Sequence, residues 1–212
     1  MMLRFDAIVF DFDGVLVEST DVKTRAFGAL YSAYGPDVER QVTAHHLANS
    51  GISRYVKFKH YHEQLLGIPY TDAVGEQLSA RFSQSVLDEV VNAPYVSGAR
   101  EFLEQYYRQL PLFVASGTPE EELREIVRRR GMQHYFRAVH GSPASKADII
   151  NGVIAGHRLS PARVLMVGDA LADFDGARAA KTAFIGRASS DGVQFPADVT
   201  VIADLNELAS RV

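Results

Sequence analysis

Two aspartates stand one residue apart at the end of an apolar run, in the stretch IVFDFDGVLVEST that spans Ile8–Thr20. Alternate residues of an extended chain point to the same side, so the carboxylates of Asp11 and Asp13 are expected to lie close together and repel each other. A helix cap explains one aspartate after a strand, but not two in alternation. A divalent cation would remove the repulsion, and Mg²⁺ prefers such hard oxygen ligands. The pair therefore predicts a metal-assisted site.

Further carboxylates follow a second apolar run, RVLMVGD. Asp169 ends this run, and Asp173 and Asp175 fall in the first turn of the helix expected after it, where acids interact favourably with the helix dipole. We interpret Asp175 as a surface acid of that kind. Asp169 and Asp173 are expected to join the first pair in a Mg²⁺ site, because carboxylates that converge without a cation would repel each other.

The segment ASGTPEEE has the features of an anion-binding site. Ser116 ends an apolar run, and Gly117 precedes a helix N-terminus, where backbone amides favour phosphate. We expect Thr118 to cap that helix, with Pro119 in its first position and Glu121 completing a capping box. This arrangement would leave the Ser116 hydroxyl to donate to a phosphate.

A lysine and the absence of cysteine complete the candidate chemistry. Lys146 stands at the head of another expected helix, where a positive charge opposes the helix dipole, so we interpret it as functional rather than merely solvated. The chain contains no cysteine, so any covalent catalysis requires a different nucleophile. An aspartate can fill that role by forming an aspartyl phosphate.

The apolar pattern predicts the elements that position these residues. Strands alternate with helices in residues 92–212, and a first strand occupies residues 3–10. Such alternation predicts a doubly wound α/β fold with a mostly parallel sheet, although the strand order does not follow from it. Ligands of such sheets bind beyond the carboxyl ends of the strands, where Asp11, Ser116 and Asp169 are expected.

A stretch of about 70 residues after the first strand has helical periodicity only. We therefore expect an α/β core domain of residues 1–16 and 92–212, interrupted by a helical domain of residues 17–91. The insertion leaves the core at the edge that carries the two aspartates. This position suits a lid over the site.

Four motifs in this order resemble those of the haloacid dehalogenase (HAD) superfamily of phosphohydrolases. DFDGVLVES is similar to the DxDGxLxxS first motif, and ASGT to the second, in which a strand ends in Ser or Thr. Lys146 resembles the third motif and VGDALAD the GDxxxD fourth. The looser similarity spans nearly the whole chain and implies a Rossmann-like core with Mg²⁺ as cofactor.

The resemblance implies a role for each matched residue. Asp11 would be the nucleophile, and Asp13 would protonate the leaving group and then activate water. Ser116 would hold the phosphoryl group, with Gly117 beside it, and Lys146 would steady the charge on nucleophile and phosphate.

The metal ligands implied by the resemblance come from the first and fourth motifs. Asp11 and Asp169 would bind Mg²⁺ directly, Asp13 through its backbone carbonyl, and Asp173 directly or through water.

Insertion of helices directly after the first motif resembles the C1-type cap of the phosphoglycolate phosphatase and β-phosphoglucomutase branch. The resemblance implies a Mg²⁺-dependent phosphatase that hydrolyses a small phosphorylated metabolite, a sugar phosphate or a phosphoglycolate-like compound, through an aspartyl phosphate. The dehalogenases lack the second aspartate, so Asp13 favours phosphate chemistry. The alternatives are a phosphosugar mutase of the β-phosphoglucomutase type and a non-catalytic binding module with the same fold.

Basic residues gather in the middle of the helical insertion, in SGISRYVKFKHYH. Arg54 and Lys57 are three apart and share a helical face. We hypothesise that Arg54, together with Lys57, contacts the substrate phosphate or hydroxyls. A solvated basic face is the alternative.

The overall composition limits the choice of partners. The net charge is −4, from 22 basic and 26 acidic residues, so nothing favours nucleic-acid binding. No apolar run approaches the length of about 18 residues that a membrane span needs. We expect a cytoplasmic protein, monomeric or weakly dimeric, whose partner is a small molecule.

Overall fold

Six strands form one sheet with the order β3-β2-β1-β4-β5-β6. The computed structural model describes residues 3–188 and 193–212. The strands are β1 (Ala7–Phe10), β2 (Leu112–Pro119), β3 (Ala138–Ser142), β4 (Val164–Gly168), β5 (Ala183–Arg187) and β6 (Thr200–Ile202). Each neighbouring pair is parallel, which confirms the predicted doubly wound α/β class and adds the strand order.

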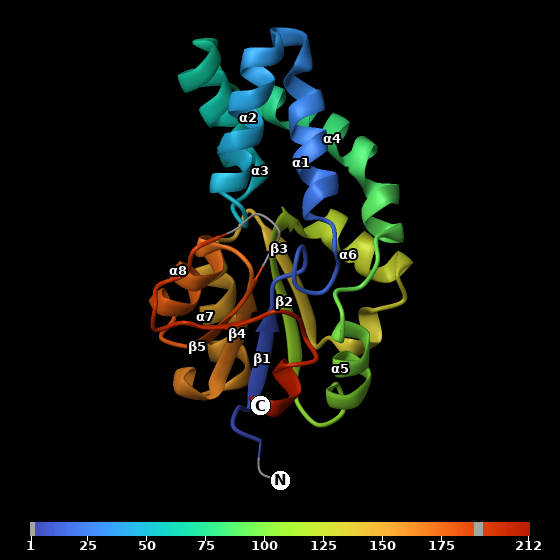
Figure 1. The fold of residues 1–212 in the computed structure, drawn as a ribbon, viewed down its shortest axis with the longest axis vertical. Helices are drawn as coiled ribbons and strands as arrows, with labels where there is room; N and C mark the ends of the chain where they lie inside the picture. Colours follow the sequence, from blue (N-terminus) through green and yellow to red (C-terminus); the bar gives the residue numbers. More distant parts are fainter. Residues whose placement is uncertain (1–2, 189–192) are drawn as a thin grey trace.

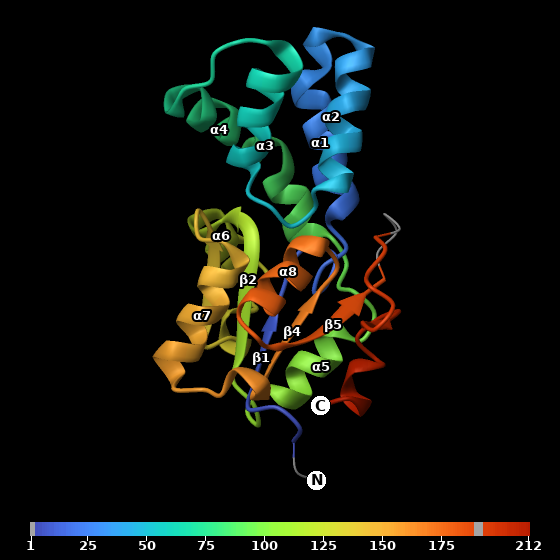
Figure 2. The same ribbon diagram turned by 90° about the vertical axis from the view of Figure 1, so that its left-hand side faces the viewer.

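Helices cover both faces of the sheet, as Figures 1 and 2 show. These helices are α5 (Ala99–Tyr106), α6 (Glu120–Arg129), α7 (Lys146–His157) and α8 (Leu171–Ala179). The alternating side chains of β1 divide between the two layers, because successive residues of a strand point to opposite faces. Ile8 and Phe10 pack with α5 and α6, whereas Ala7 and Val9 pack with α7 and α8.

Four helices stand over the carboxyl ends of the strands (Figure 1) and are called the cap helices. They are α1 (Thr20–Tyr31), α2 (Pro36–Ala48), α3 (Arg54–His60, continued by a π-helical turn over Tyr61–Leu66) and α4 (Asp72–Asn92). Aromatic rings join them: Phe27 lies 4.5 Å from Phe82 and 5.8 Å from Phe58, measured between ring centroids. The cap helices therefore have an apolar centre of their own.

The two segments that connect the cap helices to the sheet run side by side. The Glu18 amide donates to the Pro94 carbonyl at 2.9 Å, and the Val96 amide donates to the Leu16 carbonyl at 3.1 Å. This pairing fixes where the chain leaves the sheet and where it returns. Within the described ranges, no helix combines the length and apolarity required to span a membrane.

Candidate active site

The site is built at the point where the strand order reverses. The chain passes from β1 to β2 and β3 on one side, and then returns to β4 on the other side of β1. Asp11 follows β1 and Asp169 follows β4, and the Asp11 amide donates to the Val167 carbonyl of β4 at 2.9 Å. Ligands of open α/β sheets bind at such reversal points. The two aspartates are 3% and 4% exposed there.

Three of the expected carboxylates converge at this edge. Oxygen atoms of Asp11, Asp169 and Asp173 all lie within 4.8 Å of one another. Gly14 makes the close approach possible: its φ is +74°, and a Cβ at this position would lie 2.0 Å from Asp169 Oδ2. Only glycine fits a turn that combines this backbone conformation with this contact.

Lys146 contacts two of these carboxylates and also the backbone of strand β2. Its Nζ lies 2.7 Å from Asp11 Oδ1 and 2.6 Å from Asp173 Oδ1, and it donates to the Ala115 carbonyl at 2.7 Å. The second Asp173 oxygen accepts from the Ala170 amide at 3.1 Å. Burial opposes the charged ammonium, but the charges of Asp11 and Asp173 outweigh it and raise the pKa of Lys146. Asp173 therefore also positions the lysine.

The carboxylate of Asp169 lacks such support. Among residues 3–188 and 193–212, no side chain forms an ion pair or hydrogen bond with it, and only the nearby charge of Lys146 opposes the cost of its burial. Burial, followed by repulsion from Asp11 and Asp173, raises the pKa of Asp169 well above its usual value. Burial and repulsion from Asp173 likewise raise the pKa of Asp11 to about 7, against the opposing effect of Lys146. A buried carboxylate without a partner, within a cluster of oxygen ligands, fits a divalent cation.

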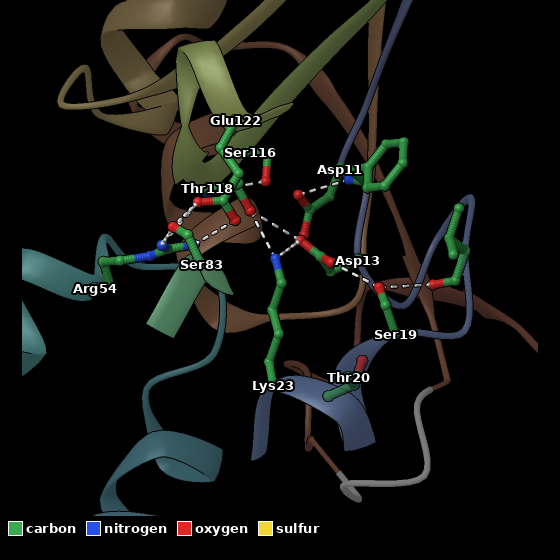
Figure 3. A network of polar contacts seen from close by, with 12 residues as sticks. Asp11, Asp13, Ser19, Thr20, Lys23, Arg54, Ser83, Ser116, Thr118 and Glu122 are labelled. Carbon is green, nitrogen blue, oxygen red and sulfur yellow. Dashed lines mark hydrogen bonds and ion pairs between the residues drawn. The ribbon is translucent and has the colours of Figure 1, made fainter. Parts of the chain in front are cut away.

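Asp13 lies in a different environment, shown in Figure 3. Its Oδ1 accepts from the Ser19 hydroxyl at 2.6 Å, and its Oδ2 accepts from Thr118 Oγ1 at 3.2 Å and from the ammonium of Lys23. Lys23 also donates to Thr118 Oγ1 at 2.6 Å. Burial raises the pKa of this carboxyl, but the charge and hydrogen bond of Lys23, together with the two hydroxyls, lower it overall. Asp13 is thus held as a carboxylate.

The expected helix cap at Thr118 is wrong. Strand β2 continues through Pro119, which pairs with Ser142 of β3, and α6 begins only at Glu120. The Thr118 hydroxyl, which sequence reasoning assigned to the helix, contacts Asp13 instead.

Ser116 and Gly117 lie against the cap helices at the end of β2. Ser116 Oγ accepts from the Thr118 amide at 3.1 Å, which leaves the hydroxyl proton available for donation. A Cβ at Gly117 would lie 2.7 Å from the Gly51 carbonyl oxygen and 3.0 Å from the Ile52 carbonyl oxygen. The loop between α2 and α3 therefore rests directly on the expected anion-binding turn.

A cavity of about 60 Å³ lies between the sheet edge and the cap helices. Its charged and histidine lining residues are Asp11, Asp13, Lys23, His46, Arg54, Lys57 and Asp169. Arg54 and Lys57 are 4% and 2% exposed, so the alternative of a solvated basic face is wrong for these two residues. The structure places both at the cavity wall.

The guanidinium of Arg54 is already engaged across the boundary between cap helices and core (Figure 3). It donates to both carboxylate oxygens of Glu122 in α6, at 2.7 and 2.8 Å, and to Ser83 Oγ in α4 at 2.7 Å. The guanidinium also lies 4.5 Å from the centroid of the Phe82 ring. Arg54 thus fastens the cap helices to the core.

Sequence reasoning missed Lys23 and Glu122 as members of the site, and it named Thr118 beside Ser116 and Gly117 but as a helix cap. Lys23 lies one turn into a helix and Glu122 within a run of three glutamates, and neither position has a distinctive local pattern. Their partners lie far away along the chain, so only the fold brings them together.

Comparisons with known proteins agree with this arrangement. A family model described as "Haloacid dehalogenase-like hydrolase" matches residues 8–187. Tyrosine-protein kinase PtkA of Mycobacterium tuberculosis is 26% identical over 178 residues, which is 81% of this chain. The chain spans 58% of the length of that relative.

Solved structures share the fold over nearly the whole chain. CbbY from Rhodobacter sphaeroides in complex with phosphate has a TM-score of 0.78 at 19% identity, with 96% of each chain covered. A predicted phosphoglycolate phosphatase from Haemophilus somnus has a TM-score of 0.76 at 17% identity, with 100% of this chain and 99% of the other covered.

Proposed function

The chain belongs to the haloacid dehalogenase-like hydrolase family, and on that premise we propose that it is a Mg²⁺-dependent phosphatase acting on a small phosphorylated metabolite. One observation carries the proposal: three buried carboxylates gather where the strand order reverses, and Asp169 has no ion-pair or hydrogen-bond partner for its carboxylate among the described residues. Phosphoryl transfer requires an oxygen nucleophile, a cation and donors to the phosphoryl oxygens.

Asp11 is the nucleophile in this proposal, and Asp169 is the principal metal ligand. Asp11, Asp169 and the Asp13 carbonyl would hold Mg²⁺, with Asp173 as a further ligand that also orients Lys146. When bound, the ion would neutralise the carboxylates and the phosphoryl oxygens. Lys146, at 2.7 Å from Asp11, holds that carboxylate in place, and Ser116 donates its hydroxyl proton to a phosphoryl oxygen.

Asp13 moves the protons. Asp11 attacks phosphorus, the ester bond breaks, and the departing oxygen takes a proton from Asp13. The resulting Asp13 carboxylate then takes a proton from water, which attacks the aspartyl phosphate and releases Asp11 and phosphate. Lys23 favours the carboxylate form of Asp13, as the second step requires. A bound phosphate dianion adds negative charge near Asp13 and favours the protonated form for the first step.

We further propose that residues 17–91 act as a C1-type cap domain that excludes water from the cavity. The cavity volume of about 60 Å³ supports a compact substrate, a sugar phosphate or a phosphoglycolate-like ester. Phosphate in the related CbbY structure supports a phosphorylated ligand. The net charge of −4 supports a small molecule over nucleic acid. A cytoplasmic location and a monomeric or weakly dimeric state stay predictions.

Hydrolysis of p-nitrophenyl phosphate tests the proposal. The wild type should release p-nitrophenol with Mg²⁺ and stop when EDTA removes it. Asp11→Asn should lose at least about 1,000-fold in kcat, because the nucleophile is gone. Asp175→Asn, which changes an exposed acid paired with Arg178 at 3.0 Å, is the matched control and should keep its activity. Full activity in EDTA or in Asp11→Asn would disprove the mechanism.

The aspartyl phosphate could also be passed to an acceptor other than water. A phosphosugar mutase would interconvert isomers and need a bisphosphate activator, which phosphorus NMR of the products would reveal. The likeness to a tyrosine-protein kinase raises a protein tyrosine as another acceptor, which phosphotyrosine detection after incubation with ATP would reveal. A non-catalytic module is disfavoured, because every matched catalytic residue is present.

A further inference from the structure

Three cations from the cap helices line the active-site cavity: Lys23, Arg54 and Lys57. Lys23 pairs with the carboxylate of Asp13, and Arg54 pairs with that of Glu122. Lys57 differs. Among the residues that the structure describes, no carboxylate lies within ion-pair distance of its ammonium, although the side chain is 2% exposed.

The surroundings of Lys57 provide a hydrogen bond but no ion pair, and Asp13 attracts the ammonium only from beyond ion-pair distance. Its ammonium donates to His46 Nδ1 at 2.9 Å and lies 5.2 Å from the centroid of the Phe27 ring. His46 is buried, and burial together with the charge of Lys57 lowers its pKa to about 2, so the ring is neutral. An ammonium kept from water without a counter-charge is costly, and a bound anion would offset that cost.

We propose that Lys57, oriented by His46, binds a second anionic group of the substrate, at the end of the leaving group that lies away from the phosphoryl ester. This inference rests on the proposed function, which places the phosphoryl group at Asp11 and Ser116, the part of the cavity lining that comes from the sheet rather than from the cap helices. The substrate class is then a phosphate monoester that also carries a carboxylate or a second phosphate.

The size of the cavity restricts this class to short molecules. A volume of about 60 Å³ holds only a few water molecules, since a cavity needs about 10–15 Å³ to hold one and each occupies about 30 Å³ in the liquid. This space accommodates a phosphoryl group and a second anionic group joined by a few atoms.

A neighbouring cavity offers the opposing interpretation. It has a volume of about 450 Å³, shares Gly51, Ile52, Ser116 and Gly117 with the first cavity, and is lined mainly by small and apolar residues. Its one lysine, Lys146, is already paired with Asp11 and Asp173. An uncharged apolar leaving group would fit this second cavity and would not need Lys57.

Binding of phosphonates, which resist hydrolysis, tests the inference without relying on turnover. In the presence of Mg²⁺, titration calorimetry would compare 3-phosphonopropionate, propane-1,3-bisphosphonate and 3-phosphonopropionamide, in which an uncharged amide replaces the second anionic group. We expect the wild type to bind at least one probe with two anionic groups about 10- to 100-fold more tightly than the amide. Comparison of the first two probes shows whether the second anionic group of the substrate is a carboxylate or a phosphate.

Two variants assign that preference to Lys57. Lys57→Met keeps the length and the apolar stem and should bind all three probes equally. Lys59→Met, at an exposed position of the same helix, is the matched control and should keep the preference. The wild-type comparison stands alone if Lys57→Met fails to fold.

Failure of this inference differs from failure of the proposed function. Equal binding of the amide and both probes with two anionic groups by the wild type, or tighter binding of an apolar phosphonate, would overturn the second-anion subsite even where p-nitrophenyl phosphate is hydrolysed. If Lys57→Met lost affinity for all three probes by the same factor, the inference would be overturned too. Preference for a probe with two anionic groups, without hydrolysis of any ester, would support the subsite and reject the phosphatase.

Discussion

The carboxylates of the site differ in what each one contacts. Asp11 and Asp173 share the ammonium of Lys146, whereas Asp13 has Lys23 and two hydroxyls. The Asp169 carboxylate is buried without an ion-pair or hydrogen-bond partner among the described residues, and only the nearby charge of Lys146 opposes the cost. These contacts separate the pKa values, lowered for Asp13 and raised for Asp11 and Asp169. Enzymes give different roles to chemically similar acids by placing them in environments that separate their pKa values.

The effect of Asp169→Asn on the stability of the folded protein should depend on whether a divalent cation is present. Without divalent cations, the variant should unfold at a higher temperature than the wild type, because one buried charge beside Asp11 is removed; the gain should be about 1 kcal/mol or more. Addition of Mg²⁺ should raise the melting temperature of the wild type and leave that of the variant almost unchanged. Asp175→Asn should respond as the wild type does. A metal-free variant less stable than the wild type would contradict the role of Asp169.

The pKa of Lys57 predicts that the stability of the folded protein depends on pH. Burial, then repulsion from Lys23 and Arg54, lowers its pKa from 10.5 to about 7, against the attraction of Asp13. Between these two values the unfolded chain binds a proton that the folded chain lacks, so stability increases with pH, by up to about 1.4 kcal/mol per pH unit. Below about pH 7 Lys57 is protonated in both states, and the folded state carries the full free-energy cost of burying the ammonium.

Urea unfolding of the wild type and Lys57→Met across this pH range measures that cost. The variant should be more stable near pH 6, and its advantage should shrink as pH rises towards 10. Other titrating groups are common to both proteins and cancel in the difference, except His46, whose pKa the charge of Lys57 lowers. Removal of that charge adds to the advantage of the variant only at the acidic end of the range. An advantage that stays constant with pH would contradict the lowered pKa of Lys57.

At the scale of elements, α6 is the part of the core that holds the cap helices. Glu122 receives Arg54 of α3, and Arg129 pairs with Asp88 of α4 at 2.8 Å. Arg130 donates to the carbonyls that end α4, at 2.6 to 2.9 Å. These carbonyls have no partner within the helix, so the arginine satisfies groups that would otherwise be left unpaired. The orientation of α6 therefore sets how the cap helices sit over the site.

Glu122→Gln should destabilise the protein by about 3 kcal/mol, because it leaves the buried Arg54 guanidinium without its counter-charge. Glu125→Gln is the matched control on the same helix: that side chain is exposed and pairs with Arg128, so the cost should stay below about 1 kcal/mol. Chemical denaturation measures both. Equal costs for the two variants would show that the pair with Arg54 does not fasten the cap helices.

The sequence predicts elements well where the signal is local. Continuous apolar runs identify β1 and β4, and the acids after them identify the sheet edge, because parallel strands end together. The helix boundary at Thr118 fails because β2 continues by pairing with β3, a contact that local capping rules do not include. Lys23 and Glu122 could not be found, since each meets partners that are distant along the chain.

At the scale of the whole molecule, one reversal in strand order decides where chemistry takes place. The cap helices leave and re-enter the sheet through paired segments next to Asp13, and their loop at Gly51–Ile52 rests on Gly117. The proposed nucleophile Asp11, the proposed acid/base Asp13 and the covering helices therefore meet within one cavity. The strand order did not follow from the sequence, because alternation of strands and helices allows several arrangements.

Trapping of the phosphorylated enzyme tests the central claim most directly. The protein would be mixed with Mg²⁺ and a phosphate monoester that it hydrolyses, quenched rapidly in acid, digested and analysed by mass spectrometry. We predict one added phosphoryl group on the peptide that contains Asp11, absent in Asp11→Asn and in wild type treated with EDTA. Turnover of the ester with no phosphorylation of that peptide, or with phosphorylation at another residue, would contradict the mechanism.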